Sequence, residues 1–118
     1  MIQSFRDLTV WQKGMDLAER IYLSTEKFPR SEMYGLTSQI RRAAVSIPSN
    51  IAEGKAIGGQ SYARHLKIAI GSESELQTQI ELARRFKILD KPEADDLLSK
   101  ASEVGRMIAM LMKSLPRD

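Results

Sequence analysis

Residues 94–115 read Ala-Asp-Asp-Leu-Leu-Ser-Lys-Ala-Ser-Glu-Val-Gly-Arg-Met-Ile-Ala-Met-Leu-Met-Lys-Ser-Leu. Apolar side chains recur here at alternating steps of three and four residues, which places them along one face of an α-helix. Just before this segment, Asp90 and Glu93 match a capping box and Pro92 suits a first helical turn. A helix is therefore predicted from Asp90 to Leu115-Pro116. Its inward positions are Ala94, Leu97, Ala101, Val104, Ile108, Leu111 and Leu115.

Three earlier segments show the same periodicity. In the first, which closes at Phe28-Pro29, the expected inward residues are Leu8, Trp11, Met15, Ala18, Tyr22 and Thr25. In the second, about residues 34–56, they are Leu36, Ile40, Ala43, Ile47 and Ile51. In the third, from Ser61 as N-cap to Leu89, they are Tyr62, Leu66, Ala69, Leu76, Ile80 and Ala83. Pro48 should kink the second helix or split it near Ser46.

These four segments together predict an all-α fold. No part of the chain shows convincing alternation of apolar and polar residues, which would indicate a half-buried strand. Residues 57–59, Ile-Gly-Gly, form the clearest flexible connection. Four amphipathic helices with mostly short connections predict an antiparallel up-and-down four-helix bundle, and the length of 118 residues fits one domain spanning residues 1–118.

The composition excludes several classes of function. The chain has no Cys and one His, which removes thiol nucleophiles, disulfides and most zinc sites. His65 has no Glu three residues before it, as di-iron bundles require, so a surface or packing role is favoured. We therefore expect no catalytic residue, metal, cofactor or small-molecule substrate.

No secretory signal is visible, and the longest apolar run, residues 107–112, is too short to cross a bilayer, so a cytoplasmic location away from membranes is expected.

The third and fourth helices carry more apolar surface than a monomer needs. The third has a second apolar arc roughly opposite its inward one, and the fourth is apolar throughout residues 107–112. We expect self-association through Ile68, Leu82, Phe86, Leu89, Met107, Met110 and Leu111. The alternative is that these side chains cover the ends of the bundle or lie under loops.

Glu73 shares the inward arc of the third helix, which favours a polar specificity role at the end of the core or at a subunit boundary.

Positive charge is in slight excess, at +3, and is centred on the middle of the sequence. On the third helix, Lys67 and Arg85 lie on one side, about 27 Å apart along the axis, so they form a stripe with Arg64. The candidate nucleic-acid-binding residues are Arg41, Arg42, Lys55, Arg64, Lys67 and Arg85. The alternative is that these charges belong to ordinary solvated helix faces.

Residues 40–54, Ile-Arg-Arg-Ala-Ala-Val-Ser-Ile-Pro-Ser-Asn-Ile-Ala-Glu-Gly, carry a family resemblance, supported by residues 5–13, 34–39, 68–72 and 75–79. The sequence resembles the small four-helix-bundle proteins encoded by intervening sequences within bacterial 23S ribosomal RNA genes. This resemblance implies a left-handed bundle that tolerates Pro48 and assembles as a ring of five subunits. The same fold is found in the accessory variability determinant of diversity-generating retroelements, a basic ring that associates with a reverse transcriptase and nucleic acid.

The resemblance implies a shape without an established biochemical activity. Residues 57–59 lack the basic residues common after the glycine at Gly54, so this loop is not expected to hold phosphate. We expect a non-enzymatic pentameric scaffold or adaptor that presents a basic surface to RNA or to a nucleic-acid-bound partner such as a reverse-transcriptase-like protein. The alternative is a protein-interaction module without nucleic-acid binding, in which Arg41 and Arg42 pair with Glu53 or Glu75 inside the oligomer.

Overall fold

The computed structural model describes residues 4–116, and within that range the protein contains helices and no strands. Four long helices are present: α1 (Thr9–Thr25), α2 (Leu36–Ile57), α3 (Gly59–Arg85) and α4 (Lys91–Ser114). Two single-turn 3-10 helices, η1 (Phe5–Asp7) and η2 (Arg30–Glu32), precede α1 and α2. The prediction of an all-α fold with four helices is confirmed.

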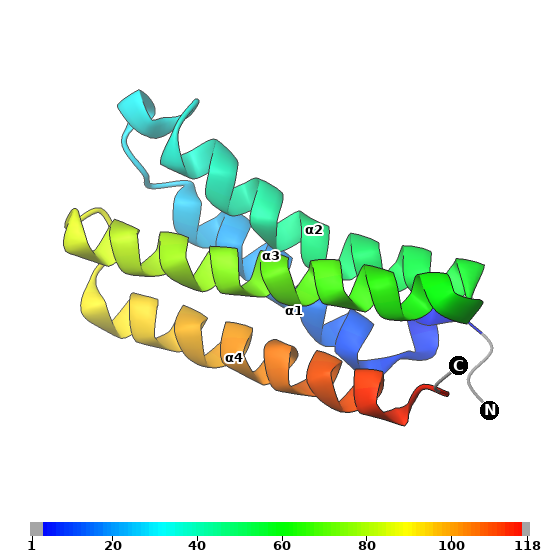
Figure 1. Cartoon of the computed structure of the whole chain (residues 1–118). Coiled ribbons are helices and arrows are strands. Elements are labelled where there is room, and N and C mark those ends of the chain that lie inside the picture. Colours follow the sequence, from blue (N-terminus) through cyan, green and yellow to red (C-terminus); the bar gives the residue numbers. More distant parts are fainter. Residues whose placement is uncertain (1–3, 117–118) are drawn as a thin grey trace.

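The helices lie side by side in an elongated body of 46 × 24 × 23 Å (Figure 1). The α1–α2 and α3–α4 connections lie at one end, and the α2–α3 connection lies at the other. Each helix packs against two others, in the cyclic order α1, α2, α3, α4. No helix in the described part of the chain is long and apolar enough to cross a membrane.

The core runs along the axis of this arrangement. The expected inward faces of α2, α3 and α4 are buried, except that Leu36, Tyr62, Leu111 and Leu115 are only half-buried at the margins. The largest side chains that are less than 2% exposed come from all four helices: Leu17, Ile21, Ile40, Ile47, Ile51, Leu66, Leu76, Ile80, Leu97, Val104 and Ile108.

The inward face of α1 differs from the prediction. Met15 and Tyr22 are 46% and 43% exposed, and the core is instead filled by Leu17 and Ile21, which are 1% and 0% exposed. The helix carries two neighbouring apolar stripes with similar spacing, and sequence periodicity alone does not decide between them. Gly14 is buried on the same side as Leu17 and Ile21 and lies against α2, where a Cβ would be in ordinary contact with Pro48 Cβ at 3.5 Å.

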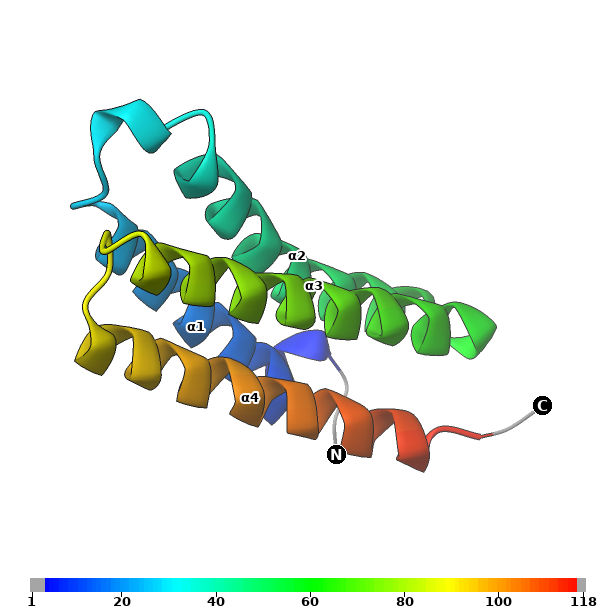
Figure 2. The same ribbon diagram turned by 60° about the vertical axis from the view of Figure 1, so that its left-hand side comes forward.

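Pro48 bends α2 without splitting it. The helix is continuous from Leu36 to Ile57, although Pro48 has no N–H to donate to the carbonyl four residues earlier. Figure 2 shows the first half of α2 rising away from α3, while the second half runs beside it. The prediction of a kinked helix is confirmed, and the alternative of a split near Ser46 is wrong.

Both ends of α3 differ from the prediction. The helix begins at Gly59 instead of after Ser61, because Gly58 and Gly59, with φ of 77° and 58°, allow an abrupt turn from α2. It ends at Arg85 instead of Leu89. The chain then turns through Lys87, whose φ is 60°, and Leu89 N–H donates back to the Ala83 carbonyl at 3.2 Å.

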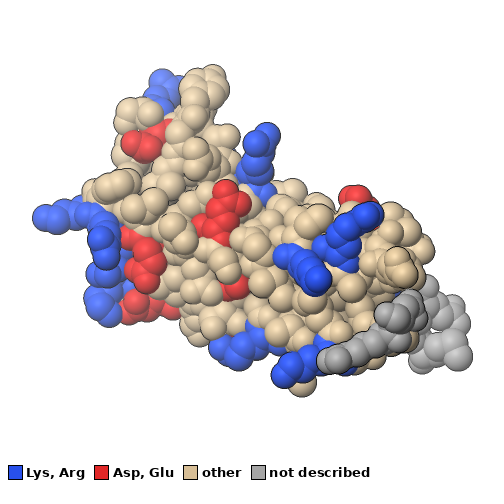
Figure 3. Space-filling model, viewed as in Figure 1, with Lys and Arg blue, Asp and Glu red and all other residues tan. Residues whose placement is uncertain are grey.

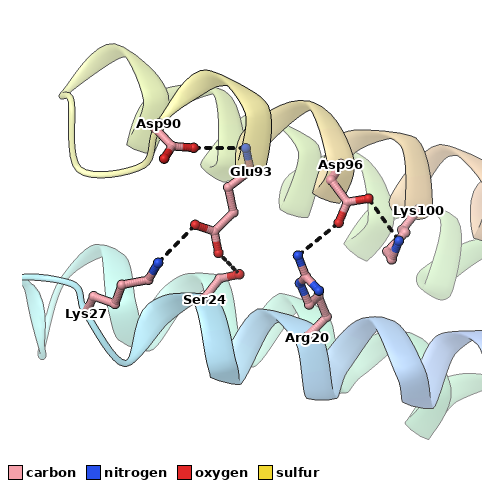
Figure 4. Close-up of polar contacts among 7 residues, drawn as sticks. All are labelled: Arg20, Ser24, Lys27, Asp90, Glu93, Asp96 and Lys100. Atoms are coloured by element: carbon pink, nitrogen blue, oxygen red, sulfur yellow. Dashed lines mark hydrogen bonds and ion pairs between the residues drawn. The ribbon is translucent and has the colours of Figure 1, made fainter.

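The start of α4 follows the prediction in part. Asp90 Oδ1 accepts a hydrogen bond from Glu93 N–H at 2.9 Å, which confirms Asp90 as the N-cap. The reciprocal half of the capping box is wrong, because the Glu93 carboxylate turns toward α1 and accepts hydrogen bonds from Ser24 and Lys27 (Figure 4).

Candidate nucleic-acid and self-association surfaces

Arg41 is engaged within the subunit. Its Nε donates to Thr25 Oγ1 at 2.8 Å, its Nη2 donates to the Tyr22 carbonyl oxygen at 3.4 Å, and its Cζ lies 4.6 Å from the centre of the Tyr22 ring. These contacts join α2 to the last turn of α1. Arg41 therefore has a structural role between these helices, and its remaining guanidinium N–H groups are not engaged by these contacts.

The other candidate cations are more available. Arg42, Arg64, Lys67 and Arg85 are exposed, and none of them forms an ion pair or a side-chain hydrogen bond with another residue between 4 and 116. Lys55 is half-buried, with its Nζ 5.9 Å from the centre of the Tyr62 ring.

The structure does not gather these cations into one patch. Lys55, Arg64 and Lys67 come from the last turn of α2 and the first turns of α3, so they share the end of the molecule where these helices meet. Arg85 lies at the other end of α3, and Arg42 lies in the first half of α2. On the face drawn in Figure 3, basic side chains are spread along the surface, and they mix most closely with acidic ones at the end carrying the α3–α4 connection.

Sequence reasoning missed the cations at that end. Lys27, Arg84, Lys87 and Lys91 come from three separate segments and line a pocket of about 540 Å³ beside the α3–α4 turn. Arg84, Lys87 and Lys91 lie within eight consecutive residues of the sequence, and folding brings Lys27 to them. Its charge is largely balanced, because Lys27 pairs with Glu93 at 3.3 Å, Arg84 with Glu81 at 3.6 Å and Lys91 with Asp95 at 2.7 Å.

A polar seam joins α2 and α3, and His65 is part of it. His65 Nδ1 lies 3.0 Å from Asn50 Oδ1, and Asn50 Nδ2 donates to Ser46 Oγ at 3.0 Å. The Ser46 and Ser72 hydroxyls are 2.8 Å apart, and His65 Nε2 lies 3.9 Å from a carboxylate oxygen of Glu53. The side chain of His65 is only 12% exposed, so it belongs to the packing between the two helices.

Glu73 lies between α3 and α4. The residue is 6% exposed, and its carboxylate accepts a hydrogen bond from Gln77 Nε2. It faces Gly105 of α4, where an added Cβ would lie 2.8 Å from Glu73 Oε1. No cation within residues 4–116 pairs with it. The absence of a side chain at Gly105 thus makes room for a buried carboxylate.

No group of three or more His, Cys, Asp or Glu that could hold a metal ion occurs in the described range.

The apolar residues expected at an interface divide into three groups. Ile68, Leu82 and Phe86 are 46%, 37% and 61% exposed on the outward face of α3. Met110 on α4 is 71% exposed, whereas Met107 and Leu111 are half-buried against the core. The expectation that Leu89 lies on the outward arc is wrong. It is 4% exposed, because the turn after Arg85 folds it over the end of the bundle.

An apolar groove between α1 and α2 was also missed. It has a volume of about 680 Å³, and its floor and walls include Trp11, Met15 and Tyr22 of α1 and Val45 and Pro48 of α2. The sequence did contain its signal, because three of these residues form the apolar stripe of α1 that periodicity had assigned to the core.

Comparison with known proteins places this geometry in a family. The family model of the 23S rRNA-intervening sequence protein matches residues 6–110. The chain belongs to this family. A solved structure of a protein of unknown function from the S23 ribosomal protein family of Bacteroides thetaiotaomicron VPI-5482 is similar in fold, with a TM-score of 0.82 and 21% sequence identity over 90% of this chain and 100% of that one. No curated protein matches the chain.

Residues 40–54 of this 23S rRNA-intervening sequence protein have clear structural roles. Pro48 packs on Gly14 of α1, as described above. Gly54 lets α2 approach α3, because a Cβ at this position would lie 2.9 Å from His65 Cβ and 3.3 Å from the Tyr62 carbonyl oxygen. Residues 40–54 thus include contacts of α2 with both of its neighbours, and the contact at Gly54 has no room for a side chain.

A polar contact between α1 and α4 lowers the pKa of the Asp96 carboxyl group. Asp96 accepts a hydrogen bond from Lys100 at 3.0 Å and lies 3.2 Å from Arg20 (Figure 4). The hydrogen bond from Lys100, together with the charges of Lys100 and Arg20, holds the pKa of the Asp96 carboxyl below its ordinary value of 3.8. Any stability from this lowered pKa is present above the unfolded value and is lost as pH falls through the folded one.

We expect NMR titration to give Asp96 a pKa below 3.8 that rises in Lys100→Met, which lacks the hydrogen bond and the charge. Added salt should also raise the pKa, because the site is exposed. An unchanged pKa in Lys100→Met would contradict this assignment.

Proposed function

We propose that this protein is a non-enzymatic homo-oligomeric scaffold or adaptor that binds RNA, or a nucleic-acid-bound partner, through a basic surface on α2 and α3. The observation that carries the proposal is the set of exposed cations without partners in the described chain on α2 and the first turns of α3, Arg42, Arg64 and Lys67. Such cations bind phosphates by releasing condensed counterions, without a requirement for a particular base sequence.

In this proposal the subunit is an antiparallel up-and-down bundle, and the working unit is a ring of five copies. Exposed apolar residues on α3 and α4 support self-association, because contiguous apolar surface is costly to leave in water. Assembly would repeat the basic surface around the ring, so a subunit charge of +3 would become about +15 in a pentamer.

The proposal predicts RNA affinity that depends steeply on salt. Arg64→Ala combined with Lys67→Ala should weaken binding to a structured RNA hairpin, measured by fluorescence anisotropy between about 50 and 200 mM salt. It should also reduce the slope of log affinity against log salt by about one for each phosphate that the variant no longer neutralises. Binding that is absent at low salt in the native protein would contradict RNA binding.

A matched control removes the same charge from another face. Lys13→Ala combined with Lys100→Ala deletes two cations that are paired with Glu103 and Asp96 on the α1–α4 side. This variant should keep its affinity for RNA and its salt slope. An equal loss of affinity in both double variants would mean that net charge alone, and not the α2–α3 surface, determines binding.

The alternative is a protein-interaction module that binds no nucleic acid. It is supported by the engagement of Arg41 with α1, which leaves one cation fewer on the surface. Arg41→Ala and Arg42→Ala separate the two functions. If Arg42→Ala weakens RNA binding and Arg41→Ala lowers only stability, the adaptor proposal holds. If the native chain and both variants bind no RNA at low salt, the interaction module is favoured.

A further inference from the structure

We propose that the groove between α1 and α2 of one subunit receives the outward face of α3 of a second copy of this chain. The inference rests on the self-association in the proposed function and specifies its contact. In this contact the exposed residues of α3 bind the groove of the neighbouring copy. The contact is head-to-tail, because two different surfaces form it.

The groove has the shape and chemistry of a binding surface for apolar side chains. Met15, Tyr22 and Val45 are 46%, 43% and 42% exposed along its sides, and Trp11 and Pro48 complete its lining. Covering this surface would remove apolar area from water, which favours association. Its volume of about 680 Å³ accepts more than one large side chain.

The outward face of α3 offers side chains that suit this groove. Leu82 lies in the last turn of α3, and Phe86 is the C-cap residue that follows the helix, with its N–H donating to the Leu82 carbonyl oxygen at 2.9 Å, so the two residues lie one turn apart. They are 37% and 61% exposed. An aromatic and an aliphatic side chain at this spacing form a compact ridge of the kind that anchors helices in apolar grooves.

Charge complementarity identifies the occupant as a second copy. Asp16 and Glu19 line the groove, and neither forms an ion pair or a side-chain hydrogen bond within residues 4–116. Arg85, adjacent to Phe86 in the ridge, likewise lacks a partner there. Among the described residues, one cation lines the groove, Arg6, and its Cζ lies 4.6 Å from the centre of the Phe5 ring. Docking would bring Arg85 toward unpaired carboxylates as Phe86 enters the apolar lining.

The placement of the two surfaces determines the symmetry of the contact. The groove belongs to α1 and α2, and the ridge belongs to α3, so each subunit carries one surface of each kind. A contact between unlike surfaces passes from one copy to the next, and it generates a ring when the rotation closes.

Two single substitutions test the contact. Phe86→Asp damages the ridge and Val45→Asp damages the groove, and both alter exposed side chains, so circular dichroism should show native helix content. Each variant alone should run at the 13.3 kDa chain mass in light scattering coupled to size exclusion. An equimolar mixture should form a dimer and stop, because one intact groove and one intact ridge remain. Leu23→Asp, at a 56% exposed apolar residue of α1 outside the groove lining, should assemble like the native chain.

A cross-linking measurement covers the case in which an introduced charge disturbs folding. The chain contains no Cys, so Val45→Cys in one copy and Phe86→Cys in another provide the only thiols. On mild oxidation the mixture should give a disulfide-linked pair containing one chain of each kind. Self-linked Val45→Cys pairs as the main product would indicate a two-fold contact and overturn the head-to-tail geometry.

The outcomes separate this inference from the proposed function. A native chain that stays monomeric at every concentration overturns the assembly on which both rest. A native oligomer that persists in both Phe86→Asp and Val45→Asp overturns the groove contact alone. Variants that become monomeric but fail to pair when mixed also overturn it, because the groove and ridge would then contact something other than each other.

Discussion

Gly54→Ala is expected to lower the free energy of unfolding by about 1–3 kcal/mol, although alanine is the better helix former. The added Cβ would lie 2.9 Å from His65 Cβ and 3.3 Å from the Tyr62 carbonyl oxygen, so backbone as well as side chains would have to move. Because α2 and α3 would be forced apart, the polar seam through Asn50 and His65 should also weaken. Denaturant unfolding followed by circular dichroism measures the effect.

Gly71→Ala is the matched control for this prediction. Gly71 also lies inside a helix, but a Cβ there has no neighbouring atom within 4 Å. The substitution should raise the free energy of unfolding by about 0.5–1 kcal/mol, because alanine loses less backbone freedom on folding. If Gly54→Ala were equally stabilising, the close approach of α2 and α3 would not be a constraint.

Leu76→Ala is expected to have the largest effect of any single substitution discussed, a loss of about 2–5 kcal/mol in the free energy of unfolding. Leu76 is 0% exposed at the centre of α3, so its removal leaves a cavity that surrounding helices can only partly fill. The measurement is denaturant unfolding at a protein concentration low enough to keep any oligomer dissociated, since assembly adds to apparent stability.

Leu82→Ala makes the same chemical change on the opposite side of the same helix. Leu82 is 37% exposed, so its truncation should cost well below 1 kcal/mol in the isolated subunit. At high concentration the Leu82→Ala chain should become less stable relative to the native chain if α3 is an oligomer contact. Similar losses of stability for both variants at low concentration would contradict the assignment of Leu76 to the core and Leu82 to the surface.

Sequence periodicity was sufficient for the number, type and approximate limits of the helices. It was also sufficient for the inward faces of α2, α3 and α4, although α3 carries a second apolar arc and α4 is apolar throughout residues 107–112. It failed on α1, where the stripe containing Met15 competes with the one containing Leu17. That choice depends on how α1 packs against α2 and α4, which are contacts between residues far apart in the sequence.

The candidate surfaces were predicted less well for a related reason. By residue type and helical position, both Arg41 and Leu89 were expected on the surface. The Arg41 side chain instead contacts α1, and Leu89 follows the turn at Lys87, beyond the end of α3, where helical periodicity no longer predicts its direction. The groove forms only when α1 packs against α2, and Lys27 joins the cations of the α3–α4 turn only in the folded chain. Helical periodicity predicts the direction in which a side chain points from its own helix. Which other residues that side chain contacts is determined by how the helices pack together.

The connections between the helices also set the order in which they can pair. A single residue, Gly58, separates α2 from α3, so these two helices can pair as a local hairpin. The contacts between α1 and α4 join residues such as Ser24 and Glu93, which are 69 positions apart. During synthesis, the central hairpin can therefore fold while the final helix is still inside the ribosome, and α1 must wait for the last part of the chain before it can complete its packing.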